Sequence, residues 1–330
     1  MPIVMVRRSR FCSATIEMVS ATSCGVMSTA GLSTCGRIQV PIIEEPRAAG
    51  DTVCSVTESP DGGGAVANKN QGPVVAFFDV DGTLTCRDFN EGLHVNPTPR
   101  VEDAIRAFVA AGNVAVVCSG RSIVNLSDLE HLPFSGYVTL DGTHVIYDDE
   151  VIYDRTIAPD TLAATVDEMR RIGMEAAFEG TYGTAALRVG LDHLPGYEDI
   201  PSLEEYERSG APMVFGKANF TDESLDVCLA SDYLMSSYTY LNVADGNHEL
   251  TIPGTSKGVG GRALLEALPF LPAHVYAFGD SENDLEILSI ADTAVVMGNA
   301  RDAVKAHADY VTDDVRDDGV VTALRHFGLI

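Results

Sequence analysis

The chain has 330 residues and a net charge of −26 at pH 7, from 22 Lys and Arg against 48 Asp and Glu. This length suggests about two domains. Residues 1–72 hold six basic and six acidic residues, so the other 258 carry the whole negative excess. This acidic part of the chain would repel DNA, RNA and anionic membranes. No apolar run approaches the ~18 residues of a membrane span. We expect neither a nucleic-acid nor a membrane partner, and a site for a phosphate ester would need local positive charge.

The segment 1–72 differs in composition from the rest of the chain. It is rich in Ser, Thr, Ala and Gly, shows no sustained period of 3.6 or 2, and contains the run SPDGGG at 59–64. This composition is typical of a flexible linker, so we predict a disordered N-terminal extension over 1–72. The alternatives are a transit peptide, which Arg7, Arg8 and Arg10 would suit, and a later start of translation at Met18 or Met27. None of the seven cysteines forms a C-x-x-C pair, which favours a reducing, cytoplasmic location.

Two carboxylates follow the first predicted strand. Residues 73–78 (PVVAFF) form a short apolar run that is typical of a strand buried on both faces. Residues two apart in a strand point the same way, so Asp79 and Asp81 project together, and Gly82 permits a sharp turn. With an ordinary pKa of about 3.9, Asp79 is ionised and could attack phosphorus, while Asp81 could protonate the leaving group and then activate water. The alternative is a calcium-type loop or a polar turn.

A second polar segment follows the next predicted strand. A helix over 99–112 and a strand over 114–118 together make a parallel crossover unit with the first strand. The strand leads into Ser119 and Gly120, whose hydroxyl and backbone N–H groups could form an anion-binding nest. Ser119 could instead only cap a helix that begins at Arg121, whose charge could serve the site or remain solvated.

A long insertion separates these motifs from the last ones. Only 39 residues lie between Asp79 and Ser119, whereas 137 lie between Ser119 and Lys257. The pattern of the insertion predicts an α+β domain over 144–244 with its own antiparallel sheet. Its expected elements are a hairpin at 144–147 and 151–153, a helix ending at Gly173, strands at 185–189, 213–218 and 238–243, and a helix at 222–234.

The chain then carries a lysine and two more carboxylates. Ser256 is a natural N-cap, but Lys257 at the first helical position opposes the helix dipole. An anion held there would explain the lysine, and a solvated lysine is the alternative. A buried strand at 275–278 leads to Asp280 and Asp284, although Asp284 could simply form a capping box with Ser281. Asp79, Asp81, Asp280 and Asp284 brought together would repel one another unless a cation lay among them, and Mg²⁺ prefers such oxygen ligands.

The segment 79–85 (DVDGTLT) resembles the first motif of the haloacid dehalogenase superfamily. Ser119, Lys257 and the segment 280–284 resemble its second, third and fourth motifs, and the tail at 294–320 resembles Cof-type members. Such members usually read Asn-Gly-Ala where this chain has Asp141, Gly142 and Thr143. The resemblance implies that the phosphate is held by backbone and side-chain groups of Val80, Ser119, Gly120, Lys257 and Asn283, and Mg²⁺ by Asp79, Asp81, Asp280 and Asp284.

The predicted fold is α/β: a doubly wound, Rossmann-like parallel sheet over 73–143 and 245–330, with an inserted α+β cap of type IIB over 144–244. The predicted function is Mg²⁺-dependent hydrolysis of a small phosphate monoester, such as a sugar phosphate, through a phosphoaspartate. A phosphosugar mutase and a non-catalytic ligand-binding protein are the alternatives. The polar or basic cap residues that could reach the leaving group are Tyr182, Arg188, His193 and Lys217.

Overall fold

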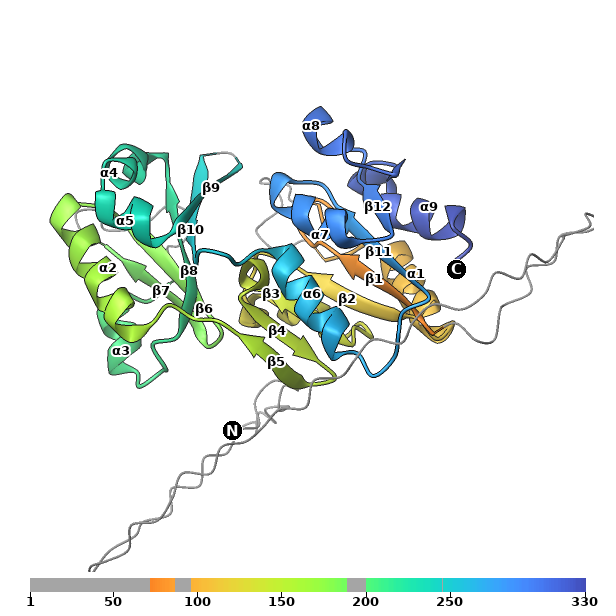
Figure 1. Cartoon of the computed structure of the whole chain (residues 1–330), viewed down its shortest axis with the longest axis horizontal. Helices are drawn as coiled ribbons and strands as arrows, with labels where there is room; N and C mark the ends of the chain where they lie inside the picture. Colours follow the sequence, from red (N-terminus) through yellow and green to blue (C-terminus); the bar gives the residue numbers. More distant parts are fainter. Residues whose placement is uncertain (1–71, 87–95, 189–199, 245) are drawn as a thin grey trace, which may run out of the picture. The chain divides into compact units, whose positions relative to one another are not determined.

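The structure is a computed structural model that describes residues 72–86, 96–188, 200–244 and 246–330. The predicted N-terminal extension, apart from Gly72, and His193 lie outside these residues. The described chain forms two sheets, one with eight strands and one with five (Figure 1). None of the described helices is both long and apolar enough to cross a membrane.

The larger sheet has the order β13-β12-β11-β1-β2-β3-β4-β5. Its first six strands in this order are parallel, and β4 and β5 continue the sheet in antiparallel pairing. Strand β1 lies in the interior of the sheet because its residues Val75 to Phe78 are apolar and completely buried. The strands are β1 (Val74–Phe78), β2 (Val114–Cys118), β3 (Gly136–Thr139), β4 (His144–Tyr147), β5 (Glu150–Asp154), β11 (His274–Gly279), β12 (Thr293–Val296) and β13 (Tyr310–Val311).

Helices cover both faces of this sheet. Leu264 and Ile287 pack with Phe77 on one face, whereas Phe78 packs against Phe108 and Phe278 through ring contacts on the other. The sheet is therefore doubly wound, as predicted. The helices of this part are α1 (Pro99–Ala110), α6 (Lys257–Ala267), α7 (Leu285–Ile290), α8 (Asp302–Lys305) and α9 (Gly319–His326). The helix expected from Arg121 is instead a 3₁₀ helix, Ile123–Leu129.

The smaller sheet is antiparallel, in the order β7-β6-β8-β10-β9. One face carries apolar side chains, such as Phe178, Phe220 and Leu250, which pack with Val166 and Met169 of α2. Its strands are β6 (Ala176–Gly180), β7 (Gly183–Leu187), β8 (Phe215–Thr221), β9 (Thr239–Ala244) and β10 (Asn247–Thr251). Its helices are α2 (Pro159–Ile172), α3 (Leu203–Arg208), α4 (Leu225–Leu229) and α5 (Asp232–Ser237).

The structure corrects the expected boundaries of the insertion. The hairpin at 144–154 forms, but it extends the larger sheet, because the chain reverses through a 3₁₀ turn at Leu140–Gly142 and β4 pairs antiparallel with β3. Strand β10 belongs to the smaller sheet, where it pairs with β8 and β9, although the insertion was expected to end at 244. The single helix expected at 222–234 is also wrong: it is divided into a 3₁₀ turn, α4 and α5, with Ser231 capping α5.

The turn after β3 fixes the start of α6. Gly142 has φ +85°, and a Cβ there would lie 1.9 Å from the carbonyl oxygen of Ser256, the N-cap of α6. We expect Gly142→Ala to lower the free energy of unfolding by about 1–3 kcal/mol through this clash and the left-handed backbone. Gly112 has a similar φ of +91° but no atom within 4 Å of its Cβ position. Gly112→Ala is thus the matched control in urea denaturation, and equal losses for both variants would contradict a contact-based effect.

Candidate active site

The candidate site lies where the strand order of the larger sheet reverses. From β1 the chain moves outward through β2 and β3, then returns to β11 on the other side of β1. Ligands bind at such a point, outside the carboxyl ends of the strands. Asp79 follows β1 there, and Asp280 follows β11. Gly82, with φ +95°, lets the loop after β1 approach Asp280 closely, since a Cβ would lie 2.3 Å from its Oδ2.

Three carboxylates gather at this point. Asp79, Asp280 and Asp284 each offer an oxygen, and these oxygens lie within 4.8 Å of one another. Burial and the charge of Asp284 raise the pKa of Asp79 well above its ordinary value. The same two causes raise the pKa of Asp280 to about 7. The cluster therefore holds more negative charge than the described side chains around it neutralise.

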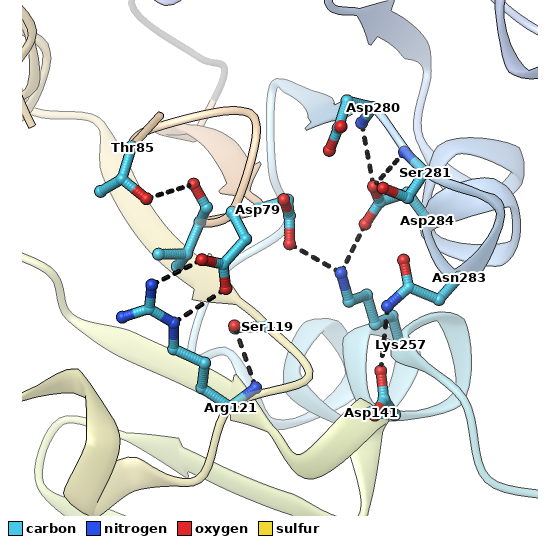
Figure 2. Close-up of polar contacts among 12 residues, drawn as sticks. Asp79, Thr85, Ser119, Arg121, Asp141, Lys257, Asp280, Ser281, Asn283 and Asp284 are labelled. Carbon is cyan, nitrogen blue, oxygen red and sulfur yellow. Dashed lines mark hydrogen bonds and ion pairs between the residues drawn. The ribbon is translucent and has the colours of Figure 1, made fainter. Parts of the chain in front are cut away.

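Lys257 bridges two of these carboxylates (Figure 2). Its Nζ donates to Asp79 Oδ1 at 2.7 Å and to Asp284 Oδ1 at 2.6 Å. The lysine is 1% exposed. Burial opposes its charge, but Asp284 and Asp79 hold the pKa of Lys257 well above its ordinary value. The predicted N-cap is confirmed, because Ser256 Oγ accepts from the Val259 N–H at 3.2 Å.

The side chain of Asp284 contacts both the local backbone and Lys257. Its Oδ2 accepts hydrogen bonds from the backbone N–H groups of Asp280 at 2.9 Å and Ser281 at 3.0 Å. This is the capping box that the sequence left as the alternative to a functional role. The other oxygen faces Lys257. The capping box is confirmed, while the role of Asp284 as a metal ligand stays a prediction.

The carboxylate cluster fits a hard divalent cation. Carboxylate oxygens are ligands that Mg²⁺ prefers. Asp280 Oδ1 is buried and has no hydrogen-bond partner among the described residues, which is costly unless a ligand satisfies it. A cation there would also offset the repulsion that raises the pKa of Asp79 and Asp280.

Asp81 does not belong to that cluster. Its Oδ2 accepts from Arg121 Nε at 2.8 Å and its Oδ1 from Arg121 Nη2 at 2.5 Å, so the guanidinium binds the carboxylate with two parallel contacts. The side chain of Asp81 therefore lies outside the carboxylate cluster, and its role as a fourth metal ligand stays a prediction. Arg121, whose role the sequence left open, lies within reach of Asp81 and neutralises it.

The predicted phosphate-binding residues lie close by. Ser119 is 1% exposed, and its Oγ accepts from the Arg121 backbone N–H at 3.1 Å. Asn283 Nδ2 donates to Asp141 Oδ1 at 3.3 Å. The carbonyl of Val80 accepts from Thr85 Oγ1 at 3.1 Å, which fixes the loop after β1. Their contacts with phosphate stay a prediction.

One cavity of about 380 Å³ joins these residues to the smaller sheet. From the larger-sheet part it is lined by predicted site residues, namely Asp79, Asp81, Ser119, Gly120, Lys257, Asp280 and Asn283. From the smaller sheet it is lined by polar residues that include Glu179, Lys217, Asn219 and Glu249. The predicted catalytic and phosphate-binding residues thus form one wall of the cavity, and polar residues of the smaller sheet form the other.

Among the four suggested cap residues, only Lys217 lines this cavity within the described chain. Tyr182 is 59% exposed, and Arg188 Nη2 donates to the Ile200 carbonyl at 3.0 Å. Sequence reasoning missed Glu179 and Glu249. The available signal was the alternation of polar and apolar residues in β6, β8 and β10, which marks a sheet with one apolar face and one polar face.

We expect Mg²⁺ to raise the melting temperature more at about pH 8 than at about pH 6. With its pKa raised to about 7, Asp280 contributes stability below its unfolded pKa and loses it as the pH rises through 7 in the metal-free protein. Mg²⁺ requires the carboxylate form, so its affinity should fall up to about tenfold per pH unit below 7. Thermal scans with and without MgCl₂ measure this.

Asp280→Asn should abolish the Mg²⁺-dependent shift in melting temperature. The matched control is Asp103→Asn, which changes an exposed acid on α1 and should leave the shift intact. A shift that is equal at both pH values, or that survives in Asp280→Asn, would argue against a cation among these carboxylates.

Comparison with known proteins identifies the family of this chain. A profile of the haloacid dehalogenase-like hydrolases matches residues 76–324. The chain is 30% identical over 269 residues to a putative phosphatase, YkrA, of Bacillus subtilis, covering 77% of this chain and 97% of that one. It is 28% identical to a phosphoglycolate phosphatase of Natronomonas pharaonis, over 74% of this chain and 94% of that protein.

Solved structures show the same architecture. The subclass IIB sugar phosphatase BT4131 superposes with a TM-score of 0.63 at 26% identity, over 78% of this chain and 100% of that one. BT1666 from Bacteroides thetaiotaomicron gives a TM-score of 0.66 at 24% identity, over 82% of this chain and 100% of its own. The predicted superfamily, its fold and an enzyme of the phosphatase type are confirmed. The chain belongs to the family of haloacid dehalogenase-like hydrolases.

Proposed function

We propose that this protein is a Mg²⁺-dependent phosphomonoester hydrolase that works through a phosphoaspartate on a small phosphorylated metabolite. One observation carries the proposal. Lys257 Nζ contacts Asp79, a residue 178 positions away, inside a buried cluster that also contains Asp284 and Asp280. A buried lysine between carboxylates, beside a cavity, is the arrangement that a phosphate dianion and a carboxylate nucleophile require.

The first half of the reaction uses Asp79. A carboxylate oxygen of Asp79 attacks phosphorus, the bond from phosphorus to the leaving oxygen breaks, and the leaving oxygen takes a proton from Asp81. Lys257, Ser119, Asn283 and the backbone of Val80 and Gly120 hold the phosphoryl oxygens. Arg121 orients Asp81 in the structure, and it must share or release that carboxylate when the proton is transferred.

In the second half, water attacks the phosphoaspartate, Asp81 accepts the proton of that water, and inorganic phosphate leaves with Asp79 regenerated. Mg²⁺ bound by Asp79, Asp280 and Asp284 would supply the positive charge that offsets the repulsion between carboxylate and phosphate dianion. The smaller sheet supplies the other wall of the cavity and would exclude water around the leaving group.

The substrate class and the location complete the proposal. A sugar phosphate or a metabolite of similar size suits a cavity of about 380 Å³. BT4131 is described as a sugar phosphatase, which supports the same class here. Cys86, Cys118 and Cys228 are free thiols, in keeping with the cytoplasmic location that we retain as a proposal.

The test is phosphate release by the purified full chain with MgCl₂ and a panel of sugar phosphates, nucleoside monophosphates and p-nitrophenyl phosphate. We expect turnover of at least one ester that stops when the metal is chelated and resumes with added Mg²⁺. No release from any ester would refute the proposal. Conversion of a sugar phosphate into an isomer, with a bisphosphate added and no free phosphate, would indicate a mutase instead.

A further inference from the structure

The smaller sheet buries charged residues on the face that lines the cavity. Along β6, β8 and β10, the apolar residues Phe178, Ala218 and Leu250 pack toward the helices. The alternate positions carry polar side chains that line the cavity, and Glu179 pairs across the strands with Lys217 and Asn219 with Glu249. These four residues are 2–9% exposed. Burying charge on a sheet is unfavourable unless partners or a ligand compensate it.

Lys217 compensates only part of this charge. Its Nζ lies 2.6 Å from Glu249 Oε1, 2.9 Å from Asp141 Oδ2 and 3.9 Å from Glu179 Oε2. One ammonium group therefore faces three carboxyl groups. Burial, and next the charge of Asp141, raise the pKa of Glu249 to about 8. A further cation bound beside this carboxyl group would favour its charged form.

Two buried acceptors here have no partner within the described chain. Glu249 Oε2 and Asn219 Oδ1 make no hydrogen bond there, although each residue is 8% exposed and lines the cavity. A buried acceptor without a donor is destabilising, and native proteins keep few of them. A bound ligand that brings N–H or O–H donors would satisfy both atoms.

The positive groups that line the cavity are already engaged. Lys257 binds Asp79 and Asp284, and Arg121 binds Asp81. Arg316, which also lines the cavity, is 63% exposed and 3.5 Å from Asp314. Among the described residues, the wall that would meet the leaving group thus offers acceptors and negative charge, with Lys217 held by its carboxylates.

We propose that Glu179, Asn219 and Glu249 form an acceptor wall that selects phosphate monoesters whose leaving group brings hydrogen-bond donors, above all a protonated amine, and rejects a second anionic group. This inference rests on the proposed function and specifies its substrate class. The inference predicts a different substrate from that of the relative in Natronomonas pharaonis, which is called a phosphoglycolate phosphatase. A glycolate carboxylate there would lie beside the carboxyl groups of Glu179 and Asp141, with Lys217 already paired to Asp141 and Glu249, which is a means of discrimination.

The decisive substrates are pairs that differ mainly in charge. O-phosphoethanolamine and 2-phosphoglycolate are close in size, and glucosamine 6-phosphate, glucose 6-phosphate and the open-chain 6-phosphogluconate are six-carbon esters of similar size. We expect kcat/KM to favour the amine over the carboxylate by about tenfold or more within each set, with glucose 6-phosphate between the two. Equal values, or a preference for the carboxylates, would overturn the proposal.

Variants test whether the acceptor wall causes the preference. Glu249→Gln and Glu179→Gln should each reduce the ratio of amine to carboxylate several-fold, mainly by improving the carboxylate substrates. Glu207→Gln, an exposed glutamate on α3, is the matched control and should leave the ratio unchanged. A ratio that is unchanged in both wall variants, or that changes equally in the control, would refute this assignment.

A binding experiment separates this inference from the proposed function. With Asp79→Asn, which cannot form a phosphoaspartate, calorimetry in MgCl₂ measures the affinity of O-phosphoethanolamine and 2-phosphoglycolate without turnover. Tighter binding of the amine supports the acceptor wall even if no ester is hydrolysed by the wild type, whereas tighter binding of the carboxylate overturns it. Turnover of p-nitrophenyl phosphate together with preference for carboxylates would refute only the inference.

Discussion

Replacing Asp79 with Asn should lower kcat by about 10⁴-fold or more, because an amide cannot form the phosphoaspartate. Asp79 is 5% exposed, and its Oδ1 accepts from Lys257. The amide oxygen of Asn can accept the same hydrogen bond, and the change removes one of the charges that repel Asp284. The fold should therefore persist, and the loss should appear in kcat rather than in the melting temperature.

The measurement is phosphate release from the best ester of the panel, together with acid-quench detection of phosphoprotein from a labelled substrate. Wild type should accumulate label that hydroxylamine removes, as an acyl phosphate requires, and Asp79→Asn should show none. Asp103→Asn controls for the loss of one negative charge at a site away from the cavity. Undiminished turnover in Asp79→Asn would mean that another group attacks phosphorus.

Lys257→Met should have the second-largest effect, and it should reduce stability as well as activity. The variant leaves Asp79 and Asp284 buried without their shared cation, and breaking a buried ion pair in this way costs about 3–5 kcal/mol. We also expect kcat to fall by about 10³-fold, since the phosphoryl charge loses its buried ammonium group. Methionine keeps most of the side-chain volume, so the effect should come mainly from charge.

The pH dependence identifies this cause. Burial and Asp284 already raise the pKa of Asp79, and without Lys257 that pKa should rise further. A carboxyl group with a raised folded pKa contributes stability below its unfolded pKa and loses it as the pH rises, so the variant should be least stable at alkaline pH. Denaturation across the pH range measures this. Lys305→Met, on α8, is the control, and an equal loss of stability at all pH values would point to packing instead.

Local patterns determined much of this protein before any contact was known. The apolar run before Asp79, the helix beginning at Pro99 and the N-cap Ser256 all form as predicted, because burial and capping depend on neighbouring residues. The strands of the smaller sheet were predicted less completely. Strands β6 and β10 were not predicted, since β6 is rich in Ala and Gly and β10 is mostly polar, which gives each a weak strand signal.

The sequence by itself determined the order of the motifs, and with it the family, the doubly wound sheet and the candidate residues Asp79, Lys257 and Asp280. Only the tertiary structure decided which charged side chains pair with one another. It placed Arg121 on Asp81, and it brought Lys217 to Asp141 across 76 positions. The physical reason is that strand periodicity tells which face a residue occupies, whereas the partner on that face depends on which strands pair and how two sheets meet around one cavity.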